Sequence, residues 1–318
     1  MSMVRANFPQ LLAPGASEIF TDFLDLKDRK DFLEDIFHEL PSTRAYEDDA
    51  FISGFSAAQI TPENAPVPFV NLIEGGSVRY IMLKSTLAAR VSWELVEDDQ
   101  YDKISKLLEG LANSANFTIS QTGANIFNNG FSIINTVDGV SLFNSQHPLL
   151  RGSEATNIGP GANFTSYAPG TFPNRPSVDV QLSVAGVQLG TTQMERMIDQ
   201  SGLSISIKPK KVIIPPELRF TAREIFGSAG KPDTSDNNLN SILGENLTYR
   251  VCDYLTGTTN WFMVAEKGQH RLKHFTRTPI TFDLDDDFNT LAFKFLMFYR
   301  EAWGVTVFYG TWGSSPTV

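Results

Sequence analysis

Residues 179–228 read DVQLSVAGVQLGTTQMERMIDQSGLSISIKPKKVIIPPELRFTAREIFGS, and the fold is best understood outward from this stretch. Apolar residues recur in its first half at three- and four-residue spacing, which predicts a helix with one buried face that ends at Gly202. That face would consist of Val178, Leu182, Ala185, Leu189, Met194, Met197 and Ile198. Since the stretch contains no motif for a nucleophile, a metal or a phosphate, we interpret it as built for shape.

The second half of the stretch predicts two strands and a helix. Residues 203–208 alternate between apolar and polar, as in a strand with one buried face, and Lys210-Lys211 would make the following turn. The apolar run 212–214 ends at Pro215-Pro216, because a missing N–H and a fixed φ stop a strand and suit the first turn of a helix. The buried face of that helix would consist of Leu218, Ala222, Ile225 and Phe226, and Gly227 would end it.

Composition narrows the class of protein. The 318 residues suffice for a large core, in one compact domain or two intertwined ones. A net charge of −10 argues against a surface made for gripping nucleic acid or an anionic membrane. Cys252 is the single cysteine, so an intrachain disulfide and a zinc site of several cysteines are excluded, which fits a reduced cytosol. No apolar run approaches the length of a membrane span, and residues 1–20 lack the features of a signal peptide.

The first hundred residues predict a helix followed by a hairpin. Residues 17–40 form an amphipathic helical pattern that Pro41 closes; it would pack either on the chain's own core or on a neighbouring subunit. Residues 78–82 and 89–96 read as two strands that pair as one long hairpin, with a bend at Gly75-Gly76. Because a two-stranded ribbon is not stable alone, we expect it to lie on something else.

A long helix follows the acidic run 97–99. Its apolar spacing continues to Phe127 and stops at Gly130, so about 30 residues are expected, or about 45 Å at 1.5 Å per residue. Gly110 and Gly123 could bend it. The expected buried positions are Tyr101, Ile104, Leu107, Leu108, Leu111, Ala112, Ala115, Ile119, Ile126 and Phe127.

Loops and strands fill the remainder. Residues 151–176 and 230–240 are rich in turn-forming residues and predict long loops, while 250–255 and 261–264 predict strands. Residues 288–312 predict a buried hairpin that bends at Gly304, with its second strand at 305–309. One face of its first strand would carry Phe293, Phe295, Met297 and Tyr299.

Two segments carry a family resemblance. The order helix, glycine, strand, then Val-Ile-Ile-Pro-Pro-x-Leu into a helix is similar to the axial domain of tailed-phage major capsid proteins. Residues 97–149 add an acidic pair that opens a long helix, then Asp138-Gly139, Leu142-Phe143 and His147-Pro148. In order and spacing this segment resembles the major head subunit of Mu-like transposable phages. The resemblance covers about residues 69–261.

The resemblance implies an α+β fold of the Hong Kong 97 type and four parts. They are an N-terminal arm region (1–67), an extended hairpin or E-loop (68–95), a peripheral domain with a long spine helix (96–135 and 279–318) and an axial domain (136–278).

It also implies a non-enzymatic major capsid protein that assembles with itself, as hexamers and pentamers, into the icosahedral shell around double-stranded DNA. The expected partners are a separate scaffold, a protease, a portal and decoration proteins; DNA would be enclosed without sequence-specific binding, and no membrane is involved. The protein would be made in the cytoplasm of a bacterial host and reside in the virion capsid.

Several side chains could act in catalysis or bind a metal, but each has a structural explanation that the sequence favours. We therefore assign no catalytic, cofactor-binding or metal site. His147 could act as a general base, but no serine or cysteine has a supporting motif, and Cys252 falls in a strand-like run; a turn histidine is favoured. His270 and His274 have the i, i+4 spacing of a helical zinc site, in a segment not clearly helical.

Two further segments were weighed in the same way. Asp283, Asp285, Asp286 and Asp287 could bind calcium, but the glycine and glutamate of an EF loop are absent, which favours a solvated acidic turn. Residues 227–231 are too short for a phosphate loop.

Two rival functions remain open from the sequence. The same fold could form an encapsulin-like nanocompartment with a protein cargo, which a genomic neighbour encoding a portal or terminase would argue against. A hydrolase or glycan-binding module could instead use the long loops, and turnover or glycan binding by unassembled subunits would favour it.

Overall fold

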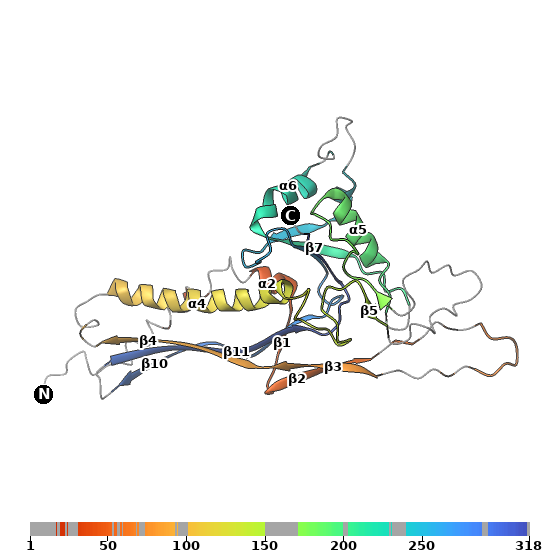
Figure 1. The fold of residues 1–318 in the computed structure, drawn as a ribbon. Coiled ribbons are helices and arrows are strands. Elements are labelled where there is room, and N and C mark those ends of the chain that lie inside the picture. Colours follow the sequence, from red (N-terminus) through yellow and green to blue (C-terminus); the bar gives the residue numbers. More distant parts are fainter. Residues whose placement is uncertain are drawn as a thin grey trace.

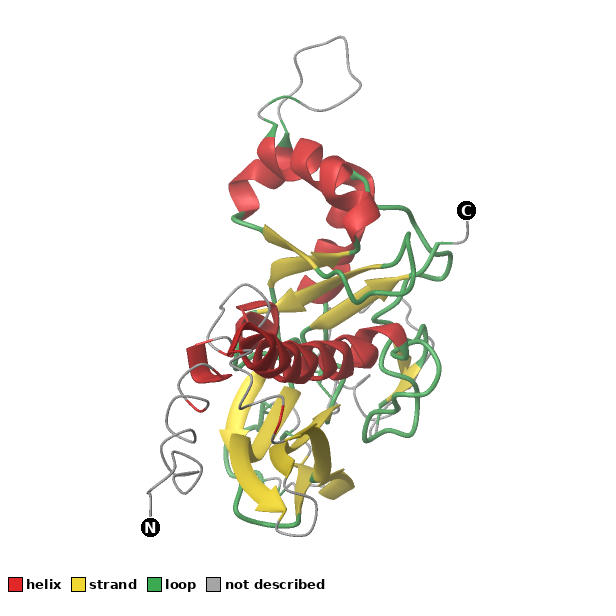
Figure 2. Ribbon diagram, turned by 90° about the vertical axis from the view of Figure 1, so that its left-hand side faces the viewer, coloured by secondary structure: helices red, strands yellow, loops and turns green. Residues whose placement is uncertain are grey.

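The computed structural model describes residues 17, 20–22, 24, 31–52, 54–55, 58, 60–67, 69, 74–92, 94, 101–149, 171–199, 203–228, 230, 240–287 and 292–316. The molecule has an elongated lower part, in which helix α4 (Tyr101–Asn128) lies along a sheet, and an upper part at one end, with its own sheet and helices (Figure 1). Seen along α4, the upper helices, the upper sheet, α4 and the lower sheet follow one another (Figure 2).

The lower sheet has four strands. Its order is β1 (His38–Pro41), β10 (Leu272–Asp287), β11 (Ala292–Val305) and β4 (Leu83–Ser92). Strand β1 is parallel to β10, and the other pairs are antiparallel. Phe293, Phe295, Met297 and Tyr299 of β11 are buried, which confirms the face predicted for this strand.

Helix α4 confirms the predicted long helix. Its 28 residues span about 42 Å at 1.5 Å per residue, and it runs unbroken through Gly110 and Gly123. The predicted positions that are buried are Ile104, Leu108, Leu111, Ala112, Ala115, Ile119, Ile126 and Phe127. The residues before Tyr101 that were expected to open the helix lie outside the described residues.

The upper part is organised on a second sheet. Its strand order is β12 (Thr311–Ser314), β9 (Trp261–Ala265), β7 (Pro209–Ile214) and β8 (Thr248–Val251). Its helices are α5 (Val184–Glu195), η3 (Pro216–Leu218), α6 (Arg219–Gly227) and η4 (Ser241–Glu245). Phenylalanines join the two parts in one core: the Phe127 ring at the end of α4 lies 5.3 Å from that of Phe262 on β9, and Phe143 lies 5.0 Å from Phe262.

The buried face predicted for α5 is confirmed at Leu182, Met194 and Met197 and is wrong at three other positions. The Ser183 hydroxyl accepts a hydrogen bond from the Gly186 N–H, which starts the helix at Val184 and leaves Val178 outside it and 76 % exposed. Ala185 and Leu189 are exposed too. The helix instead buries two glycines: a Cβ at Gly190 would lie 3.2 Å from the Trp312 ring, so only glycine allows the helix to approach the sheet this closely.

The segment after α5 differs in part from the prediction. Residues 203–208 keep the predicted alternation of burial, but they form only an isolated bridge, and Ser206 has φ +43°. Because β7 begins at Pro209, the predicted turn at Lys210-Lys211 lies inside a strand. The boundary at Pro215-Pro216 is confirmed, since β7 ends at Ile214 and the helical turns follow.

The predicted N-terminal helix ends earlier than residue 40. Helix α2 (Asp31–Ile36) ends before β1, so residues 38–40 pair with β10 instead of continuing a helix. Leu33 and Phe37 are buried against α4 and Trp303 of the same chain, which favours the intramolecular packing.

The predicted hairpin within 69–97 is also wrong. Strand β3 (Glu74–Ile81) pairs with β2 (Tyr46–Ile52), while β4 pairs with β11, and Met82 alone separates β3 from β4. Gly75 and Gly76 lie within β3 and make no bend; a Cβ on Gly76 would come 3.1 Å from the Val137 carbonyl oxygen.

The predicted C-terminal hairpin is also wrong, again because its first strand pairs with strands other than the one predicted. Strand β11 is paired on both sides, with β10 and β4, and the chain then leaves the sheet to form β12 in the upper sheet. Residues 306–309 form no strand.

The structure describes only part of the two predicted long loops. Residues 150–170 and 231–239 of the two long loops lie outside the described residues. Strand β5 (His147–Pro148) pairs with β6 (Thr171–Phe172), and Gly139 makes the expected turn with φ +78°.

Candidate assembly surfaces

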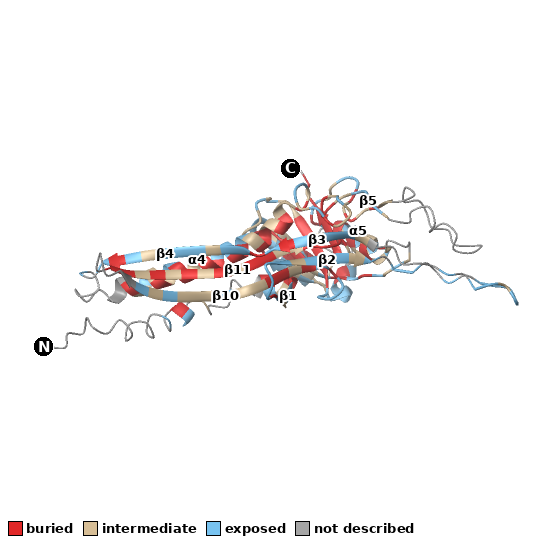
Figure 3. Cartoon of the chain, turned by 90° about the horizontal axis from the view of Figure 1, so that it is seen from below, coloured by how far each residue is buried: buried red, intermediate tan, exposed pale blue. Residues whose placement is uncertain are grey.

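The β2–β3 hairpin carries large apolar side chains that the chain does not cover. The hairpin continues the lower part away from α4 and the two sheets (Figures 1 and 3). Ile60 and Phe69, between the two strands, are 101 % and 95 % exposed. The other exposed apolar residues on or beside the hairpin are Tyr46, Ile52, Phe55, Val67, Ile81 and Leu83. So many exposed apolar residues in one element mark an interaction surface.

A charged pair stiffens the hairpin. The Arg79 guanidinium donates to both carboxylate oxygens of Asp48 across the strands, at 2.7 and 2.9 Å. Its Cζ also lies 4.2 Å from the centre of the Tyr46 ring. The hydrogen bonds from Arg79 lower the pKa of Asp48, and the Asp48 carboxylate in turn raises the pKa of Arg79.

Tyr80 fixes the base of the hairpin to the lower sheet. It is buried with Met82, Phe275 and Ala302 in a small apolar cluster, and burial raises the pKa of its hydroxyl. The hydroxyl lies 2.7 Å from that of Thr306. Gly304 leaves room for the ring, since a Cβ there would come within 2.7 Å of it.

Polar contacts complete this base. Lys273 of β10 donates to the Asp49 carboxylate at 2.5 Å, and the Ser42 hydroxyl donates to Glu47 at 2.8 Å. Asp49 also accepts a hydrogen bond from Thr306. The hairpin is therefore held at its base by β10 and the segment after β11.

The upper part exposes a second, smaller apolar surface. Phe220 on α6 and Leu243 in η4 are 72 % and 49 % exposed. Asn240 ties the two elements together: its side-chain amide donates to the carbonyl oxygens of Ile225 and Ser228.

His147 belongs to a buried structural cluster. Its Nδ1 lies 2.6 Å from an Asp138 carboxylate oxygen, its Nε2 lies 3.1 Å from the Asn174 side-chain oxygen, and its ring stacks on Phe308. Burial by itself would raise the pKa of Asp138, but hydrogen bonds from His147, Thr136 and the Val140 N–H outweigh it and lower the pKa. The cluster links the turn after α4 to the β5–β6 pair and the chain before β12.

The other candidate residues do not form a common site. His270 precedes β10, and burial lowers its pKa to about 4; His274 lies in β10, so the two are not on a helix. Cys252 is buried, which raises the pKa of its thiol to about 11. Residues 229 and 231 of the 227–231 segment lie outside the described residues.

The aspartates lie in a strand, which corrects the predicted acidic turn. Asp283 and Asp285 are exposed on alternate residues of β10, and the side chains of Asp286 and Asp287 are not among those described. Within the described residues, no group of three or more histidine, cysteine or acidic side chains is arranged to hold a metal ion. None of the described helices is both long and apolar enough to span a membrane.

Sequence reasoning missed β2, which supplies half of the hairpin. Residues 46–52 contain three consecutive acidic residues, and their burial alternates only between exposed and half-buried. The available signal was Tyr46, Ala50 and Ile52 on alternate positions, which is weak without the partner strand.

The chain is similar to known proteins in sequence profile and in fold. A family profile described as phage capsid protein matches residues 78–312. The capsid of a native GTA particle superimposes with a TM-score of 0.57 and 13 % identity, covering 92 % of each chain. A structure from Microbacterium phage Oxtober96 has a TM-score of 0.56 and 10 % identity, covering 90 % of each chain.

A third solved structure agrees. The capsid of Myoviridae phage XM1 has a TM-score of 0.54 and 12 % identity, over 90 % of this chain and 92 % of that one. No curated protein sequence matches the chain. The solved structures support the predicted Hong Kong 97-type fold over about nine-tenths of the chain.

Proposed function

The chain belongs to the phage capsid protein family and is a structural protein of the virion shell, and we propose that it builds the icosahedral head of a Mu-like transposable phage. The Mu-like assignment is supported by the long helix, Asp138-Gly139, Leu142-Phe143 and His147-Pro148 in that order. The icosahedral shell is supported by the similarity to solved capsids of the same fold.

One observation carries the proposal: the anchored hairpin presents apolar side chains that its own subunit leaves in water. Large exposed apolar surface is costly in a subunit that stays alone, and association removes it. A second copy is the partner that a shell provides at every hairpin.

Strand pairing suggests how the chain divides. We assign the extended hairpin to β2–β3 and the connection between them, in place of 68–95. The peripheral domain then consists of α4 with β4, β10 and β11, and the axial domain of α5, α6 and the upper sheet, to which β12 returns. The boundaries 96–135, 279–318 and 136–278 shift accordingly.

Further partners follow from this role. A separate scaffold, a protease, a portal and decoration proteins would act with the subunit, and the shell would enclose double-stranded DNA. The net charge of −10 supports enclosure without tight binding, since an acidic surface does not grip phosphates.

Removing the far part of the hairpin tests the proposal. The replaced range is 53–73, the connection between β2 and β3, exchanged for a short Gly-Ser linker so that both strands remain. We expect the variant to have the circular dichroism spectrum of the folded parent subunit. Electron microscopy should show no shells of the variant under conditions in which the parent assembles. Closed shells from this variant would refute the assigned role of the hairpin.

A charge-matched pair of variants separates apolar contact from added charge. Ile60→Asp with Phe69→Asp places two charges on exposed apolar positions, whereas Thr61→Asp with Asn64→Asp places two charges on exposed polar positions nearby. The first variant should stay dispersed and the second should assemble. Equal assembly by both would contradict apolar contact as the cause.

A further inference from the structure

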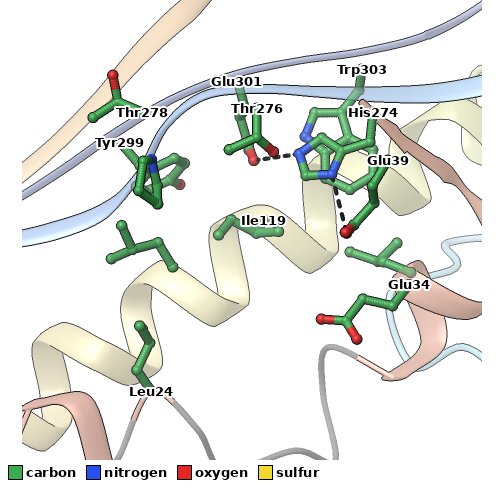
Figure 4. A pocket seen from close by; sticks show the side chains of 13 residues that line it. Leu24, Glu34, Glu39, Ile119, His274, Thr276, Thr278, Tyr299, Glu301 and Trp303 are labelled. Carbon is green, nitrogen blue, oxygen red and sulfur yellow. Dashed lines mark hydrogen bonds and ion pairs between the residues drawn. The ribbon is translucent and has the colours of Figure 1, made fainter. Parts of the chain in front are cut away.

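A cavity of about 270 Å³ lies between α2, α4 and the β10–β11 strands (Figure 4). One end is apolar, with Leu24 and Ile119, and the other is acidic, with Glu34 and Glu39. Its volume is just below the roughly 300–1,000 Å³ of pockets for drug-sized ligands, so it suits a small ligand. It lies apart from the hairpin surface.

His274 forms the polar wall of the cavity. It is 7 % exposed, stacks on Trp303 at 3.7 Å, and its Nε2 lies 3.0 Å from a carboxylate oxygen of Glu301. Its Nδ1 is buried without a hydrogen-bond partner, and Glu39 Oε1 lies 3.6 Å away. The indole N–H of Trp303 is likewise buried without a partner. A buried polar atom without a partner is costly, which points to a missing polar group in this cavity.

The described cations nearest the acidic end of the cavity contact groups other than the Glu34 and Glu39 carboxylates. Among the described residues, no lysine or arginine side chain lies within ion-pair distance of the Glu34 or Glu39 carboxylate. The neighbouring cations are engaged elsewhere: Lys211 and Arg250 pair with Asp35, at 2.6 and 2.9 Å. Lys267 contacts the main-chain oxygen of Glu34. Within the described residues, the Glu34 and Glu39 carboxylates are therefore available to a cationic group in the cavity.

The geometry does not suit a metal ion. Glu39 and Glu301 approach opposite nitrogens of the His274 ring, so their oxygens cannot converge with the ring on one ion. No three-ligand group exists among the described residues, as stated above. A cation that carries its own apolar part fits both ends of the cavity.

We propose that this cavity binds an alkylammonium cation, a protonated primary amine on an unbranched aliphatic chain. The aliphatic chain lies on Leu24, Leu33 and Ile119, and the ammonium donates its three N–H groups toward Glu34, Glu39 and His274 Nδ1. The cation is either a free amine or a lysine side chain of a second copy, which has the same chemistry.

Titration calorimetry of the dispersed full-length subunit with n-alkylamines tests the binding, and it does not depend on assembly. From ethylamine to n-butylamine the affinity should rise about fourfold per methylene, because each buried methylene contributes a constant increment. n-Butanol and butyrate, which lack the positive charge, should bind at least about tenfold more weakly. Equal binding of butanol, or no saturable binding of butylamine, would overturn the proposal.

Matched variants locate the site. Glu34→Gln with Glu39→Gln should weaken butylamine binding at least about tenfold, while Glu217→Gln, an exposed carboxylate on η3, should leave it unchanged. Circular dichroism confirms that each variant is folded. A loss of the same size in both, or in neither, would place any amine binding elsewhere.

Assembled shells distinguish the two sources of the cation. If a lysine of a second copy fills the cavity, carbodiimide treatment of shells links Glu34 or Glu39 to a lysine of another subunit, and butylamine no longer binds. If a free amine fills it, butylamine binds shells as it binds subunits, and no such link forms. Binding to neither subunits nor shells, with no link, contradicts both forms.

Discussion

Two glycines in α4 allow the packing of the N-terminal segment to be tested within one helix. A Cβ added at Gly123 would lie 2.4 Å from Leu33 Cδ2 on α2 and 3.3 Å from the Trp303 ring. A Cβ at Gly110 would meet nothing within 4 Å, and this position is exposed. Gly123→Ala and Gly110→Ala therefore make the same chemical change in the same helix, but only Gly123 faces Leu33 and Trp303.

The two substitutions are expected to change the free energy of unfolding by different amounts. Both substitutions gain about 1 kcal/mol, because alanine is the better helix former. At Gly123 the methyl group must displace Leu33, and overpacking costs roughly 1–3 kcal/mol. Gly110→Ala should raise the free energy of unfolding by about 1 kcal/mol, and Gly123→Ala should lie about 1–3 kcal/mol below it. Helix propensity cancels in that difference, which leaves the contact with Leu33 on α2 and the weaker approach to Trp303.

Urea unfolding of dispersed subunits, followed by circular dichroism, measures both variants. A change of about 1 kcal/mol moves the midpoint by roughly 0.3–1 M at urea slopes of about 1–3 kcal/mol per M. If Gly123→Ala is as stable as Gly110→Ala, Leu33 is not packed on α4 of its own subunit. The intramolecular packing of the N-terminal segment on α4 would then be refuted.

Three further outcomes are expected. Replacing Pro215 and Pro216 by Ala should lower the free energy of unfolding by about 1 kcal/mol, because the preset helix start is lost; an unchanged urea midpoint would contradict this. Because the pKa of Asp138 is lower in the folded than in the unfolded chain, its contribution is present above about pH 4 and is lost as pH falls below it. Asp138→Asn should remove this part of the acid sensitivity, measured as midpoints from pH 7 to pH 3, and an unaltered pH profile would exclude the role of the cluster. Finally, the midpoint of the parent should rise with protein concentration, since association covers the hairpin; a constant midpoint, with no shells, would count against assembly.

Long periodic segments were predictable from the sequence. The spacing of Leu108, Ala112 and Ala115 specifies a helix face without any knowledge of its partner, and the alternation along β11 specifies a strand face in the same way. The boundary at Pro215-Pro216 was predictable because proline acts through its own backbone. These signals are local, and tertiary packing did not override them.

Pairing and close approach were not predictable. Strands β3 and β4 look like the two arms of a hairpin, yet each finds its partner far away in the chain, in β2 and β11. Glycines misled the reading twice. Gly76 allows contact with Val137 and makes no bend. Gly190 lets α5 approach Trp312 closely, and the spacing of apolar side chains does not predict that a glycine is buried. The cavity at His274 combines residues from α2, β1, β10 and β11, so no spacing in the sequence reveals it.

Only Met82 separates strand β3 of the hairpin from strand β4 of the lower sheet, so the two strands are mechanically linked. Met82 is buried, its N–H donates to the Ala45 carbonyl oxygen at 3.2 Å, and it joins the hairpin strand β3 to β4 without a flexible linker. Strand β4 then pairs with β11 along its ten residues, and β11 lies under α4. A neighbour that holds the hairpin therefore also restrains the edge of the sheet on which the long helix rests. If a neighbour holds the hairpin as proposed, that restraint adds to the free energy of unfolding of the subunit itself, and we expect assembly to stabilise the tertiary fold as well as to cover apolar surface.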